Sequence, residues 1–204
     1  MMPWEHAAVG YISYSLLVHA CFRESPSSPE TVVIALAAVF PDLVDKPLAW
    51  QFDVFAGGHA LGHSVFFALP FVSLLLWLAW LRGRERLGIA FAVGYLLHLP
   101  GDVVPPYLLD GALRLDRMFW PLGSRGTGYE SGFTGEFLSK INSYVEWIVE
   151  QTTTGNPDPY FLVLLGIGVF GTALWIYDGM PVGRDIARFS RRLVRSVGGA
   201  VRGQ

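Results

Sequence analysis

A long uncharged stretch in the middle of the chain limits the folds that are open to it. No Asp, Glu, Lys or Arg occurs from Val54 to Leu81, and residues 63–81 alone would form a helix about 28 Å long. That length approaches the thickness that a membrane-spanning helix of about 20 residues crosses. The chain is 52% hydrophobic and 16% charged, whereas soluble domains are about a quarter charged. We therefore expect an all-α, polytopic membrane helical bundle.

Two histidines, His59 and His63, stand four residues apart at the start of this stretch. If a helix begins by His59, both imidazoles project from one face about 6 Å apart and can bind one metal ion. Imidazoles at the opening of a membrane-length helix have to be hydrated, paired or ligated. The pair therefore indicates a metal site.

Other imidazole and acidic groups stand at the ends of further apolar runs. They are His6 in the first run, Asp42 and Asp45 after the second, and His98 and Asp102 after the run that follows the basic turn 82–86. Two antiparallel helical hairpins would bring all these ends together, with a height difference of only about 5 Å in the second hairpin. Taken singly, His6 suits a surface position and the two aspartates suit a helix-end turn and cap. His19 lies outside the pattern, as a packed or lipid-interface residue.

The predicted ligands determine which metals suit the site. Imidazole and carboxylate without thiolate match zinc, with manganese as the alternative. The one cysteine, Cys21, excludes a cysteine-based site. Seven candidates exceed the four ligands of one tetrahedral zinc, so we expect one to three ions, or one ion with hydrogen-bonding neighbours: His6, Asp42, Asp45, His59, His63, His98 and Asp102. Asp45 and Asp102 are the two candidates for a catalytic carboxylate that accepts a proton from a metal-bound water.

The sequence divides into three predicted parts. Residues 1–122 form the membrane domain with the metal site, and residues 123–159 an extramembrane segment with an amphipathic helix over 132–151. Residues 160–204 hold a transmembrane helix and a basic tail, in which six of the fifteen basic residues lie between 184 and 202. The positive-inside rule places the tail and the turn 82–86 in the cytoplasm. We expect no cleaved signal peptide, because the N-terminus lacks a basic region, and no nucleic-acid partner.

Short motifs in the first 122 residues resemble a known family. They are FPDLVD at 40–45, HALGHS at 59–64, GYLLHL at 94–99 with Asp102, and Trp120-Pro121. In this order they resemble the membrane-bound, metal-dependent hydrolases, which include a LexA-binding inner-membrane protein and are distantly similar to zinc-dependent phospholipase C and single-strand-specific zinc nucleases. The resemblance implies an inner-membrane location, action on phosphoesters such as phospholipids, and ligand roles for His6, Asp42, His59, His63, His98 and Asp102. The family commonly has Arg and Thr where this chain has Ala60 and Gly62.

Two classes of function fit these observations. The first is a metal-dependent hydrolase with its site at the outer membrane face. The second is a non-catalytic membrane protein with a structural or transported metal ion. A transporter needs polar groups through the bilayer, and few lie below the predicted site: Ser13, Ser15, His19 and Ser73. A purely structural site has no open position for water.

Overall fold

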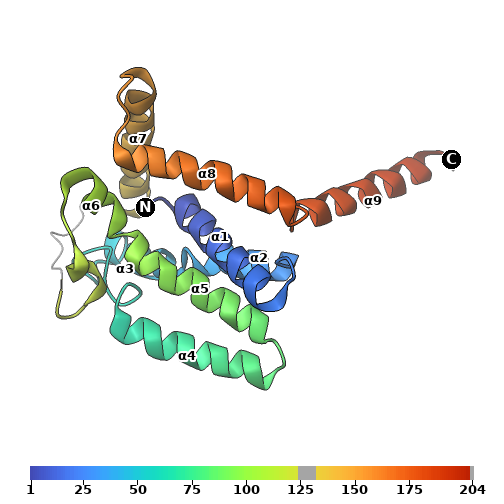
Figure 1. The fold of residues 1–204 in the computed structure, drawn as a ribbon, viewed down its shortest axis with the longest axis horizontal. Coiled ribbons are helices and arrows are strands. Elements are labelled where there is room, and N and C mark those ends of the chain that lie inside the picture. Colours follow the sequence, from blue (N-terminus) through green and yellow to red (C-terminus); the bar gives the residue numbers. More distant parts are fainter. Residues whose placement is uncertain (124–131, 203–204) are drawn as a thin grey trace.

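A computed structural model of the protein describes residues 1–123 and 132–202, which form helices and contain no strand. The elements, labelled in Figure 1, are α1 (Pro3–Phe22), α2 (Ser28–Ala37), α3 (Phe40–Trp50), α4 (Val65–Leu81), α5 (Glu85–Gly101), α6 (Val104–Asp110), the 3₁₀ helix η1 (Leu115–Met118), α7 (Gly132–Thr153), α8 (Pro159–Tyr177) and α9 (Gly183–Arg202). The structure confirms the predicted all-α class and the helices expected over 132–151 and 160–177.

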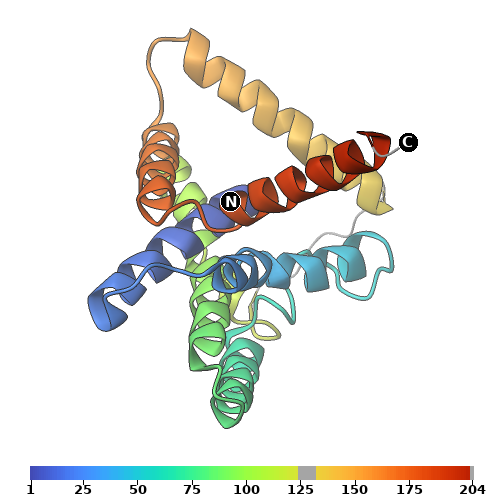
Figure 2. The ribbon, with the colours of Figure 1, turned by 90° about the vertical axis from the view of Figure 1, so that its right-hand side faces the viewer.

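Helix α5 is the centre of the bundle. It packs against α1, α2 and α4, and α1 packs in turn against α2 and α8 (Figures 1 and 2). Two hairpins, α1–α2 and α4–α5, reverse at residues 23–27 and 82–84. The N-terminus, α3, α6 and α7 gather at one end of the bundle, and α9 extends from the other (Figure 1). The predicted hairpin arrangement is therefore confirmed.

The contact between α2 and α5 is close because a glycine stands at its centre. A Cβ atom added at Gly94 would lie 2.8 Å from the carbonyl oxygen of Ile34 and 3.0 Å from the Cβ of Ala37. Small residues allow helix backbones to approach in this way in membrane bundles. The close approach places the C-terminal half of α5 beside the end of α2.

Within the described residues, two helical segments are long and apolar enough to cross a membrane: Glu85–Asp110, which joins α5 and α6, and Pro159–Tyr177, which is α8. The most apolar window of the first is 56% buried inside the protein, whereas that of the second is only 6% buried. Helix α5 is thus a core helix, and α8 presents an apolar surface outward, as expected of a helix in contact with lipid. Helix α4 is apolar but shorter.

The helix expected to begin by His59 starts only at Val65. Residues 51–64 form turns and bends instead, because the glycines at 57, 58 and 62 disfavour a helix and the side chain of Asp45 binds backbone N–H groups of this loop. The prediction that His59 and His63 share a helix face is therefore wrong. Their rings are nevertheless neighbours, with centroids 4.7 Å apart.

Candidate metal centre

The predicted site residues meet at the end of the bundle where the N-terminus lies. Four of them form a buried group whose ligand atoms all lie within 4.8 Å of one another: Asp42, His63, His98 and Asp102. They come from α3, the 51–64 loop and the C-terminal end of α5. The expectation that both hairpins deliver polar groups to one place is confirmed.

The spacing of this group suits a tetrahedral metal ion. The Nε2 atoms of His63 and His98 are 3.0 Å apart. Asp42 Oδ1 lies 3.5 and 3.8 Å from these two nitrogens, and Asp102 Oδ2 lies 3.4 and 3.6 Å from them. Ligand bonds of about 2.0–2.2 Å in a tetrahedron separate the ligand atoms by about 3.3–3.6 Å. The five separations of 3.0–3.8 Å are therefore close to those of such a site.

The hydrogen bonds of the two imidazoles leave their inner nitrogens without a partner of the right kind. His98 Nδ1 lies 2.7 Å from the carbonyl oxygen of Ala38, which can only accept, so Nδ1 donates. His63 Nδ1 likewise donates to the Asp45 carboxylate at 2.8 Å. If both rings are neutral, both Nε2 atoms are then acceptors that face each other. A cation between them resolves this conflict, either a proton on one ring or a metal ion.

Asp42 has the same need for a cation. Its Oδ1 is buried and receives no hydrogen bond from the described residues, while its Oδ2 forms an ion pair with Lys46. Buried carboxylate oxygens are costly unless they are hydrogen-bonded or bind a metal. The unpartnered oxygen is also the one that faces His63 and His98.

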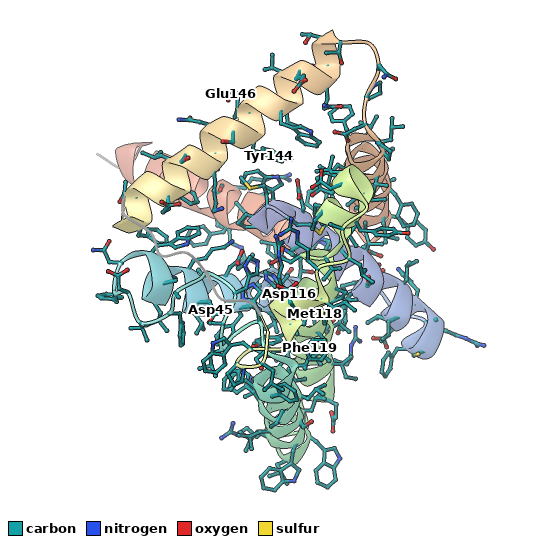
Figure 3. All side chains as sticks on the ribbon, turned by 90° about the vertical axis from the view of Figure 1, so that its left-hand side faces the viewer. Asp45, Asp116, Met118, Phe119, Tyr144 and Glu146 are labelled. Carbon is teal, nitrogen blue, oxygen red and sulfur yellow. The ribbon has the colours of Figure 1, made fainter. Side chains whose placement is uncertain are left out.

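Asp45 has a different environment, although it lies only three residues further along α3. Its two oxygens accept hydrogen bonds from the backbone N–H groups of Ala60, Gly62 and His63 at 2.7–3.1 Å, in addition to the bond from the His63 ring. Figure 3 labels Asp45 in the interior, beside the nitrogen-rich centre. A Cβ atom added at Gly62 would lie 2.9 Å from the Pro41 carbonyl oxygen. The loop is therefore held directly on α3, which orients His63.

His6 and His59 contact the carboxylate of Asp102. His6 Nε2 lies 3.0 Å from Oδ1, and the His6 ring stacks on His98 with centroids 3.8 Å apart. His59 Nε2 lies 3.2 Å from Oδ2. Asp102 therefore joins the group of four to two further imidazoles, so all seven predicted residues belong to one connected cluster.

Charges within the centre oppose the effect of burial. Burial alone would raise the pKa of Asp42, but the adjacent His63 ring and the Lys46 ammonium hold this pKa below its usual range. Burial would lower the pKa of His63, but the adjacent carboxylates of Asp102, Asp42 and Asp45 raise it to about 10. The pKa of His59 is lowered, mainly by burial. The centre thus attracts positive charge, which a divalent ion can supply in place of a proton.

A cavity of about 550 Å³ reaches the centre at His59 and Asp102. Its walls include residues that sequence reasoning did not single out: Glu5, Lys46, Arg117, Lys140, Tyr144 and Tyr160. Lys46 could have been found from its i,i+4 spacing to Asp42. Arg117 and Lys140 reach the site through tertiary packing, and no local signal marks them. Ser64 donates to the Trp120 carbonyl at 2.6 Å, which ties the segment that carries Arg117 to the loop.

The comparisons with known proteins agree with a membrane location. A family model described as YdjM inner membrane protein matches residues 1–177. No curated protein and no solved structure matches the chain. The matched range covers α1 to α8 and every residue of the metal centre. This chain therefore belongs to the YdjM inner membrane protein family.

Proposed function

We propose that this inner membrane protein is a metal-dependent hydrolase that acts on phosphoesters at the membrane surface. The observation that carries the proposal is the buried Asp42 Oδ1, which has no hydrogen-bond partner among the described residues and faces two imidazole nitrogens that lie 3.0 Å apart. Asp42, His63, His98 and Asp102 would hold one ion, zinc or manganese by their donor types. The ion would polarise a phosphoryl oxygen and lower the pKa of the attacking water.

The cavity favours catalysis over a structural metal. A structural zinc site is closed on all sides by protein, whereas a space of about 550 Å³ reaches His59 and Asp102 here. Transport across the membrane has less support, because the polar groups buried further along α1 and α2 are already paired: Ser15 donates to Asp178, and Glu30 accepts from Arg86. A hydrolase is therefore the function that the geometry supports best.

The protein groups divide into two roles under this proposal. Asp45 positions His63 through the Nδ1 hydrogen bond, and its oxygens are occupied by backbone donors. His59 Nε2 donates to Asp102, which leaves Nδ1 as an acceptor. A water in the cavity can lose its proton to that nitrogen. His6 supports Asp102 from the other side, or contributes to a second ion.

We further propose that the chain crosses the membrane several times, with the metal centre toward the outer face. The basic turn 82–86 and the tail lie at the opposite end of the bundle from the centre (Figure 1), and basic segments favour the cytoplasm. Single cysteines at Arg84 and Leu113, with Cys21 replaced, test this arrangement. An impermeant thiol reagent added to intact cells should label position 113 alone. Labelling at position 84 would reverse the orientation.

Elemental analysis and a substrate screen test the hydrolase function. The purified protein, never exposed to chelator, should contain at least one zinc or manganese per chain, and two would assign a second ion to His6 and His59. It should hydrolyse some members of a panel of phosphomonoesters, phosphodiesters and phospholipids. His59→Gln should retain metal and lose turnover. Metal-replete protein without activity on the whole panel would contradict the proposal.

A further inference from the structure

Three cationic side chains surround the cavity beside the metal centre. They are Lys46 from α3, Arg117 from η1 and Lys140 from α7. Arg117 Nη1 donates to the carbonyl oxygen of Asp102 at 3.1 Å, so the guanidinium is held next to a proposed ligand. The ammonium groups of Lys46 and Lys140 lie 5.7 and 5.5 Å from the ring centroid of Trp50, so both make cation–π contacts with this ring.

Besides Asp102 of the centre, two acidic residues line this cavity. Glu5 accepts hydrogen bonds from Tyr144 at 2.7 Å and from Tyr160 at 2.5 Å, and Glu136 is the second. Lys46 additionally pairs with Asp42 of the centre. Arg117 and Lys140 therefore come from outside the metal centre and bring positive charge to a space that already adjoins a metal position. Such a combination is suited to a phosphate group, whose oxygens accept charge-assisted hydrogen bonds.

An apolar slot continues from the cationic cavity. It has a volume of about 160 Å³, lies between α3 and α7, and shares Met2, Lys46, Trp50 and Lys140 with the larger space. Its other walls are mainly apolar, from Val39, Leu43, Pro47, Phe133, Phe137 and Ile141. A cavity of this size accommodates a hydrocarbon group of about six carbons. A charged and an apolar compartment are thus joined beside the metal centre.

Helix α7, which forms one side of the slot, has the character of a membrane-surface helix. Figure 3 shows Tyr144 on the side of α7 toward the bundle and Glu146 on the outward side. Exposed apolar side chains also occur along α7, at Leu138, Val145 and Val149. Helices with one polar and one apolar surface lie in the interface between lipid and water. The slot is therefore at the level where lipid chains are available.

We propose that the substrate is a membrane lipid with a phosphate headgroup, rather than a soluble phosphoester. The headgroup phosphate contacts Arg117, Lys140 and Lys46 beside the metal centre, and part of one hydrocarbon chain enters the slot between α3 and α7. This assignment rests on the proposed function for the centre. It adds the source of the phosphate, since a soluble ester would leave the slot without a role.

Binding measurements on the full-length, metal-replete protein in a maltoside detergent, which carries no phosphate, test the assignment. Calorimetric titration compares dioctanoyl phosphatidate with glycerol 3-phosphate, which shares the phosphomonoester group and lacks the chains. Phosphatidate should bind at least about tenfold more tightly, because each buried methylene contributes to affinity. Equal affinities for the two ligands would overturn the proposal.

Two pairs of variants test the cationic cavity and the apolar slot separately. Arg117→Gln should weaken both ligands about tenfold, whereas Arg114→Gln, an exposed neighbour outside the cavity, should weaken neither. Ile141→Gln should weaken phosphatidate alone, whereas Leu138→Gln, on the same helix but outside the slot, should leave it unchanged. Phe137→Gln repeats the slot test if the first variant loses helicity. Unchanged phosphatidate binding in folded Arg117 and slot variants would overturn the assignment.

Turnover is scored separately from binding. Selective phosphatidate binding without hydrolysis of any ester would refute the hydrolase function and leave the lipid site standing. Hydrolysis of soluble esters combined with equal binding of the two ligands would refute the lipid assignment and leave the hydrolase function standing.

Discussion

Two buried clusters of aspartate and histidine occur at opposite ends of α1, and their hydrogen bonds differ. At one end, Asp178 accepts bonds from Tyr11 at 2.6 Å, Ser15 at 2.7 Å and His19 at 2.6 Å. Both carboxylate oxygens of Asp178 therefore have donors. At the other end, about 20 Å along the helix from His19 to His6, the candidate metal centre has two imidazole nitrogens 3.0 Å apart and an Asp42 oxygen with no hydrogen-bond partner among the described residues. The same residue types thus form a complete network in one place and an incomplete one in the other.

The Asp178 cluster fastens α8 to α1. Burial would raise the pKa of Asp178, but the bonds from Tyr11, Ser15 and His19 outweigh this effect and lower the pKa. The carboxylate therefore stabilises the fold as an anion, without a metal. His19, which we expected to be a packed or interface residue, belongs to this network.

The largest difference between the clusters should appear on removal of one histidine from each. His63→Ala deletes one of the four proposed ligands and should abolish metal binding at the centre, because Asp42, His98 and Asp102 alone leave the site incomplete. His19→Ala should retain the metal content of the unmodified protein. Elemental analysis of both purified variants measures the effect. Equal metal content in the two would refute the metal centre, provided that folded yields are similar.

A smaller effect is expected where a residue orients a ligand without binding the metal. Asp45→Asn weakens the hydrogen bond with His63 Nδ1 and the hydrogen bonds from the backbone N–H groups of the 51–64 loop. Loss of such an orienting partner typically lowers metal affinity about 10–100-fold. Competition with a chelator of known affinity gives the change. Complete loss of metal, equal to that in His63→Ala, would instead make Asp45 a ligand.

The Asp178 cluster should respond in stability alone. Asp178→Asn weakens three hydrogen bonds to a buried charge, and we expect a loss of about 2 kcal/mol with unchanged metal content. Because folding lowers the pKa of Asp178, its contribution is present above the unfolded pKa of about 3.9 and is lost as the pH falls further through the folded pKa. Thermal unfolding in detergent between pH 3 and pH 7 checks both points. Altered metal content in Asp178→Asn would instead show that the two clusters are energetically coupled.

The smallest effect should follow from a methyl group at the helix contact that supports His98. Gly94→Ala introduces a Cβ within 2.8 Å of the Ile34 carbonyl oxygen, and such overpacking costs about 1 kcal/mol or more. His98 lies one turn further along α5, so metal affinity should also fall a few-fold. Gly168→Ala on α8, with open space around the added atom, is the control. Equal stability of the two variants would show that the α2–α5 contact is not tight.

The proposed ligands could be identified from the sequence because heights in the bundle follow from helix length. His6, Asp42, His63, His98 and Asp102 stand at the ends of apolar runs, and two antiparallel hairpins bring such ends to the same side of the bundle. The apolar composition and the long uncharged stretch likewise indicated a helical membrane protein. These conclusions depend on the number of residues between the polar groups, which can be counted in the sequence.

The division of roles within the site depended on the tertiary structure. Asp42 and Asp45 lie on the same short helix, and only the course of the 51–64 loop makes Asp45 the partner of backbone N–H groups while Asp42 faces the imidazoles. The cations Arg117 and Lys140 arrive from segments with no local motif. Spacing along a helix determines height and face, but the direction of each face and the path of each loop are determined by packing against residues far away in the chain.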